Sequence, residues 1–437
     1  MLSLDFRVLI SFIQRPFPIT FSIAESDSMR GFFNVSDIDS VLGLTGSFPS
    51  TPHEPIPLQE ALGRTLAEDV ASDIDIPGFH RATMDGYAVR AQDTFGASQG
   101  TPAWLTLKGD VAMGESPDFS LFPGEAAAIA TGGMLPKGAD AVVMVEQTDR
   151  VDETTVEIYK SVAPGHHIIS RGEDFQAEKP ILLAGTHLGP SQIGLLAAAG
   201  VANVPVHQRP KVGIISTGDE VVEVDQCPQG AQIRDINTHT LSAMVHEAGG
   251  EAVCFGIAGD GEGDLAPLLK QALDHCQMVL ISGGSSVGMR DRTLGTLEGA
   301  EHAEIMVHGI SISPGKPTIL ARMEKTPVWG LPGHAASAMV VFEVVVRPFL
   351  KRLAGEKITP RPKVEARLSR NIASAQGRTD FIRVRLTENP HGGYDAEPLL
   401  GKSGLIRTMV HAHGLIRIEK EQEGLYKESR VAVSLLP

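Results

Sequence analysis

The sequence predicts a multidomain chain of the α/β plus β class. Strand-like and helix-like segments alternate from about Lys211 to Leu353, which is the rhythm of a doubly wound α/β domain. Short β runs separated by turns fill residues 102–160 and 360–437, and such runs are typical of small β domains and barrels. The length of 437 residues leaves room for about three domains of ordinary size.

The α/β part is predicted from its apolar pattern. Short apolar or β-branched runs indicate buried strands, and apolar residues that recur every three or four positions indicate helices. The predicted strands are 211–216, Glu251–Ile257, 278–281, Thr318–Arg322 and Val328–Trp329, and the predicted helices are Asn237–Ala248, Asp264–His275 and Ala335–Leu353.

The flanking parts read differently. Leu58, Ala61, Leu62, Leu66 and Val70 recur at helical spacing and predict a helix. We predict strands at Trp104–Leu107, Ala126–Ile129, Ala141–Val145, Thr155–Tyr159, Ile181–Leu183, Phe381–Leu386, Gly414–Ile418 and Val431–Leu435, and a short helix from Ser191. The last three strands predict a small antiparallel β domain or barrel at the C-terminus. The sequence contains no internal repeat and no low-complexity segment.

Charge and cysteine content narrow the function classes. The formal net charge is -15 and the pI is about 5.5. General nucleic-acid binding is therefore not expected, because it needs a basic surface that displaces counterions. The three cysteines, Cys227, Cys254 and Cys276, have no CxxC spacing. They indicate a reducing compartment, which we take to be the cytoplasm, and argue against a zinc knuckle.

The N-terminal stretch is treated separately. Leu2–Ile23 is apolar, but charged residues and two prolines interrupt it, so no run is long enough to span a bilayer. We therefore expect residues 1–35 to be a disordered or spurious extension of the chain, and no membrane partner. A short targeting or membrane-touching segment is the alternative.

Three glycine-containing loops follow predicted strands. One runs from Ser282 to Ser285, with Asp291 nearby, a second is Gly218 to Glu220, and a third begins at Pro332. Glycines there let backbone N–H groups approach an anion closely, and a carboxylate can hold a cation that bridges to it. Because parallel sheets bind ligands outside the carboxyl ends of their strands, we expect the three loops to share one crevice.

The charged residues near these loops suggest the chemistry. The carboxylates are Asp219, Glu220, Asp260 and Asp291, and the cation is Lys316 in the turn Ser313–Pro317. Carboxylates with glycine loops and a lysine suit a phosphorylated ligand held through Mg²⁺, since hard oxygen ligands favour magnesium over zinc. A structurally inert α/β domain is the alternative. Neither a P-loop nor the GxGxxG pattern is present.

Two further features have a functional and a structural interpretation. Asp85 precedes Gly86 at a turn, and Thr131 opens a Gly-Pro loop. Thr131 can donate to an oxyanion, yet each residue can equally cap its own turn. The pairs His239/His246 and His411/His413 lack a cysteine or carboxylate at an established ligand spacing. We interpret both pairs as ordinary surface histidines.

Six motifs in order along the chain resemble one known family. They are PGFxxxxMDGYAVR (Pro77–Arg90), ATGGMLPxGADAVVMVEQT (Ala130–Thr148), STGDE (Ser216–Glu220), SGGSSVGxxD (Ser282–Asp291), SPGKP (Ser313–Pro317) and LPGHAAS (Leu331–Ser337). Together they resemble the MoeA family, the molybdopterin molybdenumtransferases, which are related to the E domain of gephyrin. The resemblance runs from about Leu58 to the C-terminus.

The resemblance implies an elongated, four-part chain that forms a homodimer. Its parts would be a discontinuous linker domain (36–75 and 161–208), a β-rich domain (76–160), a MoaB/Mog-like α/β molybdopterin-binding domain (209–353) and a C-terminal β-barrel-like domain (360–437). It implies that the chain inserts molybdate into adenylylated molybdopterin with Mg²⁺ and releases AMP. A MogA/MoaB-type adenylyltransferase is the expected partner protein.

The resemblance also implies residue roles. Asp85 and Thr131 would reach across the dimer, while Glu220, Asp260 and Asp291 would hold the cation and the pterin, and Lys316 would meet the molybdate. Catalytic roles would fall to Asp85, Thr131, Glu220, Asp291 and Lys316. The implied substrate-binding residues are Gly218, Asp260, Gly283, Gly284, Ser286, Pro314, Gly315, Pro332, Gly333 and Ser337.

The chain departs from the family pattern inside the expected site. Ser313 stands where a second lysine or arginine is usual, His334 and Ala335 replace Asn-Pro, and Ala82 stands where serine is common. Protonated His334 or Arg290 would be the substitutes for the missing cation. These departures motivate an alternative, a paralogue that binds molybdopterin or a partner protein without efficient metal insertion. A scaffold like gephyrin is a third interpretation.

Overall fold

The computed structural model describes residues 35–283 and 287–437, without the side chains of 287–291. Of the predicted N-terminal extension, only Val35 falls within this range. Among the described residues, no helix is both long enough and apolar enough to cross a membrane.

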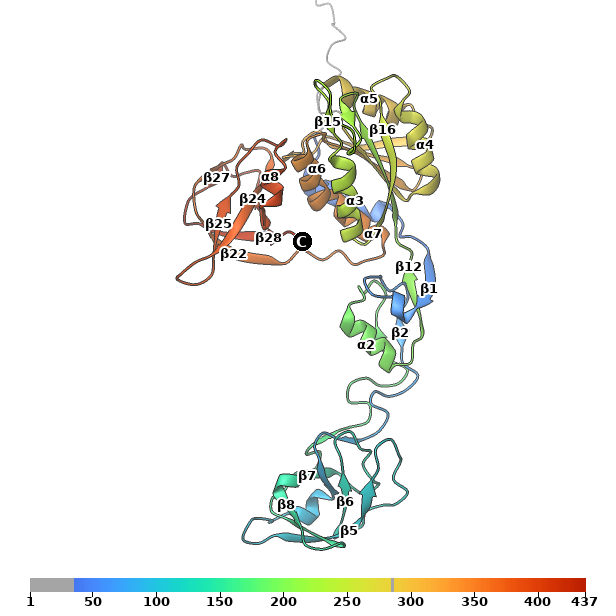
Figure 1. Cartoon of the computed structure of the whole chain (residues 1–437), viewed down its shortest axis with the longest axis vertical. Coiled ribbons are helices and arrows are strands. Elements are labelled where there is room, and N and C mark those ends of the chain that lie inside the picture. The colour runs from blue at the N-terminus through green and yellow to red at the C-terminus, as the bar shows by residue number, and fades with distance from the viewer. Residues whose placement is uncertain (1–34, 284–286) are drawn as a thin grey trace, which may run out of the picture. The chain divides into compact units, whose positions relative to one another are not determined.

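A six-stranded sheet forms the centre of the α/β part (Figure 1). Its strands, in spatial order, are β16 (Glu251–Ala258), β13 (Lys211–Thr217), β17 (Met278–Ser282), β21 (Thr326–Leu331), β20 (Ile319–Met323) and β18 (Ala303–His308). The first four are mutually parallel, and β20 runs antiparallel to both of its neighbours. The helices are α3 (Asn237–Glu247), α4 (Leu265–His275), α5 (Val287–Glu298), α6 (Ala335–Val341) and α7 (Arg347–Leu353).

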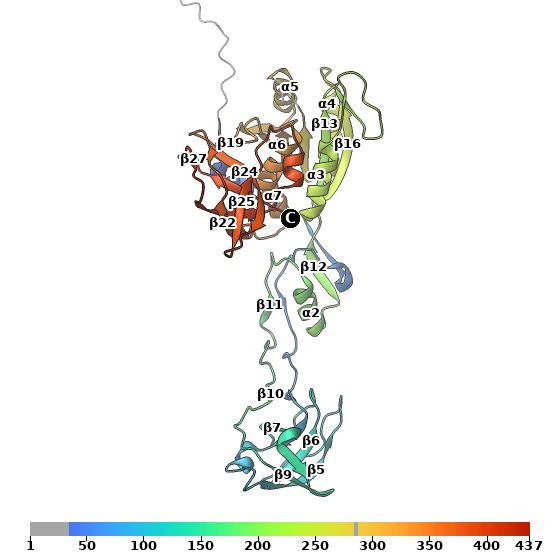
Figure 2. The ribbon, with the colours of Figure 1, turned by 60° about the vertical axis from the view of Figure 1, so that its left-hand side comes forward.

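Alternate residues of each strand supply two separate cores. On β17, Met278 and Leu280 pack with α3, α6 and α7, while Val279 and Ile281 pack with α4 and α5. This is the two-residue period of side chains along a strand that is buried on both faces. Figure 2 shows α3 and α4 on opposite faces of the sheet. The predicted doubly wound α/β domain is confirmed.

The segment before the α/β part contains a second six-stranded sheet. Its strands, in spatial order, are β7 (Ala141–Met144), β4 (Gly86–Val89), β6 (Glu125–Ile129), β5 (Ala103–Val111), β9 (Thr155–Ile158) and β8 (Thr148–Arg150). Two apolar clusters cover its faces, one around Val143 and one around Val142. The β-rich character predicted for this segment is confirmed.

The chain segments that precede and follow that sheet in the sequence pair with each other. β1 (His53–Pro57) pairs with β12 (Asn203–His207), β2 (Val70–Ala71) with β11 (Pro180–Leu182), and β3 (Arg81–Ala82) with β10 (Ile168–Ile169). Helix α2 (Pro190–Ala198) packs beside them. The remaining short helices, outside the sheets, are α1 (Ile38–Gly43) and α8 (Arg407–Val410).

The helix predicted over Leu58–Val70 is wrong. The structure has only a 3-10 turn at Leu58–Glu60, and β2 begins at Val70. Gly63 adopts a φ of 73°, a left-handed conformation that interrupts a helix. Leu66 donates its backbone N–H to the Thr186 carbonyl. Backbone groups in this segment thus form hydrogen bonds with residues far away in the sequence. This tertiary pairing prevailed over the helical spacing of the apolar residues.

The C-terminal segment closes into a five-stranded barrel. The strands are β24 (Thr379–Glu388), β25 (Tyr394–Pro398), β22 (Lys363–Leu368), β28 (Arg430–Leu435) and β26 (Gly414–Ile418), and a β24–β26 pairing closes the ring. β19 (Ile312–Ser313), from the α/β part, pairs in parallel with β24. The predicted C-terminal barrel is confirmed, and β19 joins it to the chain that leads to Lys316.

Candidate active site

The three predicted loops leave one edge of the α/β sheet. β13, β17 and β21 are adjacent and parallel, and Ser216 faces Ser282, which faces Leu331. Their carboxyl ends therefore lie side by side. The predicted single crevice stays a prediction, because Pro332 lines one cavity and Asp260 another, and Gly284 and Ser286 lie outside the described residues.

Gly283 is required by close packing at this edge. A Cβ at Gly283 would lie 2.0 Å from the Thr217 Oγ1 and 2.6 Å from the Thr217 carbonyl oxygen, and φ is +150°. Only a residue without a side chain allows β13 and β17 to approach so closely at their ends.

We expect Gly283→Ala to shift this loop and to lower the free energy of unfolding by about 1–3 kcal/mol, as overpacking does. Urea unfolding of the purified protein measures the change. Gly295→Ala is the matched control, because a Cβ there meets nothing within 4 Å. Equal stability of the two variants would contradict the close approach.

Two acidic loops are tied to each other. The backbone N–H of Asp260 donates to the Asp219 Oδ1 at 2.8 Å, and the N–H of Asp219 donates to the Asp260 Oδ2 at 3.4 Å. Glu220 is half-buried beside Gly218. The Arg292 guanidinium donates to the Asp260 carbonyl, and Asp260 borders a cavity of ≈ 1060 Å³.

These carboxylates suit magnesium by their chemistry, because Mg²⁺ prefers hard oxygen ligands. Within the described residues, however, no group of three His, Cys, Asp or Glu side chains is arranged to hold a metal ion. The side chain of Asp291 is not described. The set Glu220, Asp260 and Asp291 therefore stays a prediction.

A second cavity, of ≈ 960 Å³, gathers the predicted anion-binding residues. From the α/β part it is lined by Pro314, Gly315, Lys316, Pro332 and Ser337. Glu220 and Asp260 do not line it. The opposite wall comes from the C-terminal barrel and its loops, and its polar lining residues include Arg378, Arg383, Ser403 and Lys420. We call this space the oxyanion cavity.

Arg383 is the distinctive member of the oxyanion cavity. The residue is 8% exposed, and its Nε and Nη1 have no hydrogen-bond partner among the described residues. Its Nη2 donates weakly to the Gly401 carbonyl at 3.4 Å. Burial lowers the pKa of the Arg383 guanidinium, which still stays protonated near neutral pH. A buried cation with open donors favours an anionic ligand.

Two other cations that were not predicted from the sequence line this cavity, and each forms an ion pair with a carboxylate. The Arg378 Nε lies 2.9 Å from the Asp380 Oδ1, and the Lys420 Nζ lies 2.7 Å from the Asp37 Oδ2. That contact, as a hydrogen bond from Lys420, lowers the pKa of the Asp37 carboxyl. Arg383 thus brings a charge that no described carboxylate within ion-pair distance balances.

The departures from the family pattern lie in the same cavity. Ser313 and His334 line it, and the His334 Nδ1 lies 2.9 Å from the Ser403 Oγ. Arg383 supplies a cation in the space where Ser313 lacks one. Arg290, the other suggested substitute, has no described side chain. Arg383 was not predicted from the sequence, because nothing local links GRTDFIR (Gly377–Arg383) to a turn some 65 residues earlier in the chain.

Asn237 and Ser282 are further polar residues near this sheet edge that were not predicted from the sequence. Asn237 begins α3, and its Nδ2 donates to the Gly333 carbonyl at 2.8 Å. Its Oδ1 and the Ser282 Oγ are buried without a hydrogen-bond partner in the described part of the chain. Asp235 accepts from the Thr238 N–H at 3.0 Å. This Asp-x-x-Thr contact was the available signal, since it lies at the start of α3, directly after β15 (Ile233–Arg234).

Asp85 and Thr131 lie together in the β-rich part. The Asp85 Oδ1 accepts from the Thr131 N–H at 2.7 Å and from the Thr131 hydroxyl at 2.8 Å. The backbone hydrogen bond is the larger cause of the lowered pKa of Asp85. Gly86 must lack a side chain, because a Cβ would lie 1.9 Å from the Val143 carbonyl oxygen. The pair caps its own loops, and its reach toward another subunit stays a prediction.

Comparisons with known proteins give the family. Family models match residues 35–200 (MoeA N-terminal region, domain I and II), 213–352 (probable molybdopterin binding domain) and 365–436 (MoeA C-terminal region, domain IV). The molybdopterin molybdenumtransferase of Haemophilus influenzae is 34% identical over 377 residues, covering 86% of this chain and 91% of that protein. The chain belongs to the MoeA family. The predicted membership is confirmed.

Other MoeA-family relatives agree in sequence and in structure. The molybdopterin molybdenumtransferase of Nostoc sp. is 37% identical over 308 residues, covering 69% of this chain and 70% of that protein. A crystal structure of the molybdopterin biosynthesis MoeA protein from Pyrococcus horikoshii OT3 matches with a TM-score of 0.76 at 31% identity. It covers 92% of this chain and 100% of that one.

Proposed function

We propose that this MoeA-family chain inserts molybdate into adenylylated molybdopterin and releases AMP. Its place among the molybdopterin molybdenumtransferases of molybdenum cofactor biosynthesis follows from family membership. The finer steps, namely the adenylylated substrate, the magnesium ion and the residue roles, are our proposal.

The observation that carries the proposal is Arg383 in the oxyanion cavity. An oxyanion such as molybdate can accept a charge-assisted hydrogen bond from the Arg383 guanidinium, whose Nε and Nη1 have no partner among the described residues. Lys316 lines the same cavity from the other wall. A binding site for an uncharged ligand gains nothing from these cations, whereas an anion offsets the cost of burying the Arg383 charge.

The cations also address the main barrier. Molybdate and the phosphoanhydride are both negative, so their approach is opposed electrostatically, and fixed positive groups in the cavity lower that barrier. Arg383 and Lys316 would bind and orient the oxyanion, and Ser337 would donate a hydrogen bond to it. Glu220, Asp260 and Asp291 would hold Mg²⁺, which would neutralise charge on the phosphates.

The assembly belongs to the proposal as well. We propose a cytoplasmic homodimer in which Asp85 and Thr131 of one protomer close the site of its partner. A MogA/MoaB-type adenylyltransferase would supply the substrate. The exposed side chains of Phe79, Met84 and Met113 in the same part of the chain support contact with another surface.

The test is AMP release from adenylylated molybdopterin, measured with and without molybdate. We expect release that depends on molybdate and magnesium in the wild type. In Lys316→Met the KM for molybdate should rise tenfold or more, since a hydrogen bond to a charged group contributes about 1.5–3 kcal/mol. Lys325→Met, an exposed lysine outside the cavity, is the control.

The rival interpretation makes a different prediction in the same assay. A paralogue that only binds molybdopterin would retain the pterin and release no AMP at any molybdate concentration. Asp291→Ala adds a check on the metal set. AMP release by this variant at the wild-type rate would remove Asp291 from the mechanism.

A further inference from the structure

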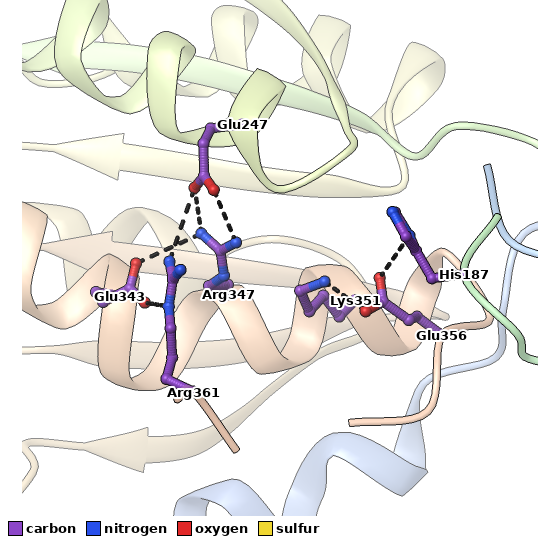
Figure 3. Close-up of polar contacts among 7 residues, drawn as sticks. All are labelled: His187, Glu247, Glu343, Arg347, Lys351, Glu356 and Arg361. Carbon is purple, nitrogen blue, oxygen red and sulfur yellow. Dashed lines mark hydrogen bonds and ion pairs between the residues drawn. The ribbon is translucent and has the colours of Figure 1, made fainter. Parts of the chain in front are cut away.

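A partly buried network of charges lies in the middle of the helical run Ala335–Leu353, beyond its first turn, where Ser337 lines the oxyanion cavity. Arg347 on α7 holds Glu247, the last residue of α3, with both guanidinium nitrogens (Figure 3), and the Nη2–Oε1 distance is 3.0 Å. The Arg347 Nη1 also lies 3.5 Å from the Glu343 Oε2. Arg361 donates from Nε to Glu343, and its Nη2 lies 3.8 Å from the Glu247 Oε2. The two arginines and two glutamates sum to zero charge.

A π-helical turn places Glu343 in this network. Phe342–Val346 forms a π-helical turn, and the N–H of Arg347 donates to the Phe342 carbonyl. Pro348 follows and has no N–H to continue the α-helical pattern. The wider π-helical turn accommodates the missing backbone N–H of Pro348. The result is a buried carboxylate, with 5% of its side chain exposed, that faces Arg361.

Arg361 lies outside the α/β part, on the connection to the barrel. The connection runs from the end of α7 at Leu353 to the start of β22 at Lys363. Pro360 and Pro362 flank Arg361, so the backbone there has little freedom. The Pro362 carbonyl accepts from the Leu435 N–H at the end of β28, at 3.0 Å. Arg361 is therefore one residue away from the hydrogen bonds of the barrel.

The first half of the connection is tied as well. The Lys351 Nζ lies 2.5 Å from the Glu356 Oε1, and the His187 Nδ1 lies 3.8 Å from the Glu356 Oε2 (Figure 3). Both ends of this short segment are thus held by ion pairs to fixed elements.

The barrel has a different attachment near the oxyanion cavity. Ile312 and Ser313 pair with Thr379 and Asp380 at the start of β24, the strand that carries Arg383. The barrel residues Phe381, Met409 and Leu415 also share the apolar core of the α/β part. Arg417 and Lys420 of the barrel form ion pairs with Asp39 and Asp37 at the start of α1. Arg361 adds a further attachment where the chain enters the barrel, and so narrows the range of positions that Arg383 takes relative to Lys316.

We propose that Arg361, held by Glu343 and Glu247, is a positioning residue for the oxyanion cavity. It acts through the barrel and touches no substrate. The consequence for activity rests on the proposed function, whereas the consequence for barrel orientation does not. Releasing Arg361 lowers the fraction of molecules in which Arg383 and Lys316 face one another, and the apparent affinity for molybdate falls by that fraction.

Two variants separate positioning from folding. Arg361→Met leaves Glu343 with one partner fewer, whereas the double variant Glu343→Gln/Arg361→Met removes one charge of each sign and keeps the Arg347–Glu247 pair. Arg430→Met, an exposed arginine on the barrel, is the control. We expect both test variants to raise the KM for molybdate about tenfold, with kcat within about twofold of wild type. Only the single variant should lose stability in urea.

A spin-label distance gives a readout that is independent of activity. Labels at Gln271→Cys on α4 and Glu388→Cys on β24, both exposed, report the orientation of the barrel once the exposed Cys227 and Cys254 are replaced by serine. We expect a broader distance distribution in both test variants than in the control.

Unchanged distributions, or a double variant with the wild-type KM, would overturn the positioning role and leave a purely structural one. A wild-type protein that releases no AMP would end the proposed function, yet the distance measurement would still decide the role of Arg361.

Discussion

Arg383→Met is expected to lower molybdate-dependent AMP release about 100-fold while leaving the protein at least as stable as the wild type. The loss follows because truncating a buried charged partner costs about 2–5 kcal/mol of binding, and about 1.4 kcal/mol is a factor of ten. Methionine fills a similar volume, so the cavity wall is kept.

The expected gain in stability has a separate cause, which is the removal of a buried charge. In the free protein, Arg383 is 8% exposed with two guanidinium nitrogens that lack partners among the described residues. Burying such a charge opposes folding, and replacing it with an apolar side chain is neutral or stabilising by about 1 kcal/mol or more. A site that binds an anion through a buried cation therefore lowers the stability of the free protein.

Steady-state kinetics over a series of molybdate concentrations check the loss of activity, and urea unfolding of the same preparation checks the stability. Arg385→Met is the control, because Arg385 lies on the same strand with 43% of its side chain exposed. A variant that keeps its activity, or one that loses several kcal/mol of stability, would show that Arg383 serves the fold.

Arg347→Met is expected to lower the free energy of unfolding by about 3–5 kcal/mol, because it leaves Glu247 and the buried Glu343 short of a partner. Domains are commonly stable by only about 5–15 kcal/mol, so this is a large part of the total. Urea unfolding measures it. Arg352→Met, on the same helix, is the control, because Arg352 takes no part in the ion pairs of this network among the described residues.

The pH dependence of unfolding offers a second check on Arg347. Burial alone raises the pKa of the Glu247 carboxyl, but the hydrogen bond and charge of Arg347 outweigh it and lower that pKa below 4.5. A lowered pKa means that the stabilisation is present above pH 4.5 and is lost as the pH falls through the folded-state value. Wild type should therefore lose stability below that pH more steeply than Arg347→Met. Parallel curves would contradict the pairing.

Part of the candidate site was predictable because one topological rule governs it. Strands β13, β17 and β21 read as apolar runs, and parallel strands that follow one another through helices present their carboxyl ends at one edge. The loops at Gly218, Gly283 and Pro332 were therefore expected together. The turn that carries Lys316 was also visible, since Pro314 and Gly315 mark it.

By itself, the sequence determined the family, the fold class and the position of the candidate loops along the chain, because motifs and apolar periodicity are local properties of the chain. Tertiary structure decided that Arg383 faces the cavity of Lys316, and that Leu58–Val70 is not an α-helix. Barrel closure and the β19–β24 pairing join segments far apart in sequence. Which buried cation lacks a partner depends on those contacts, and no local pattern records them.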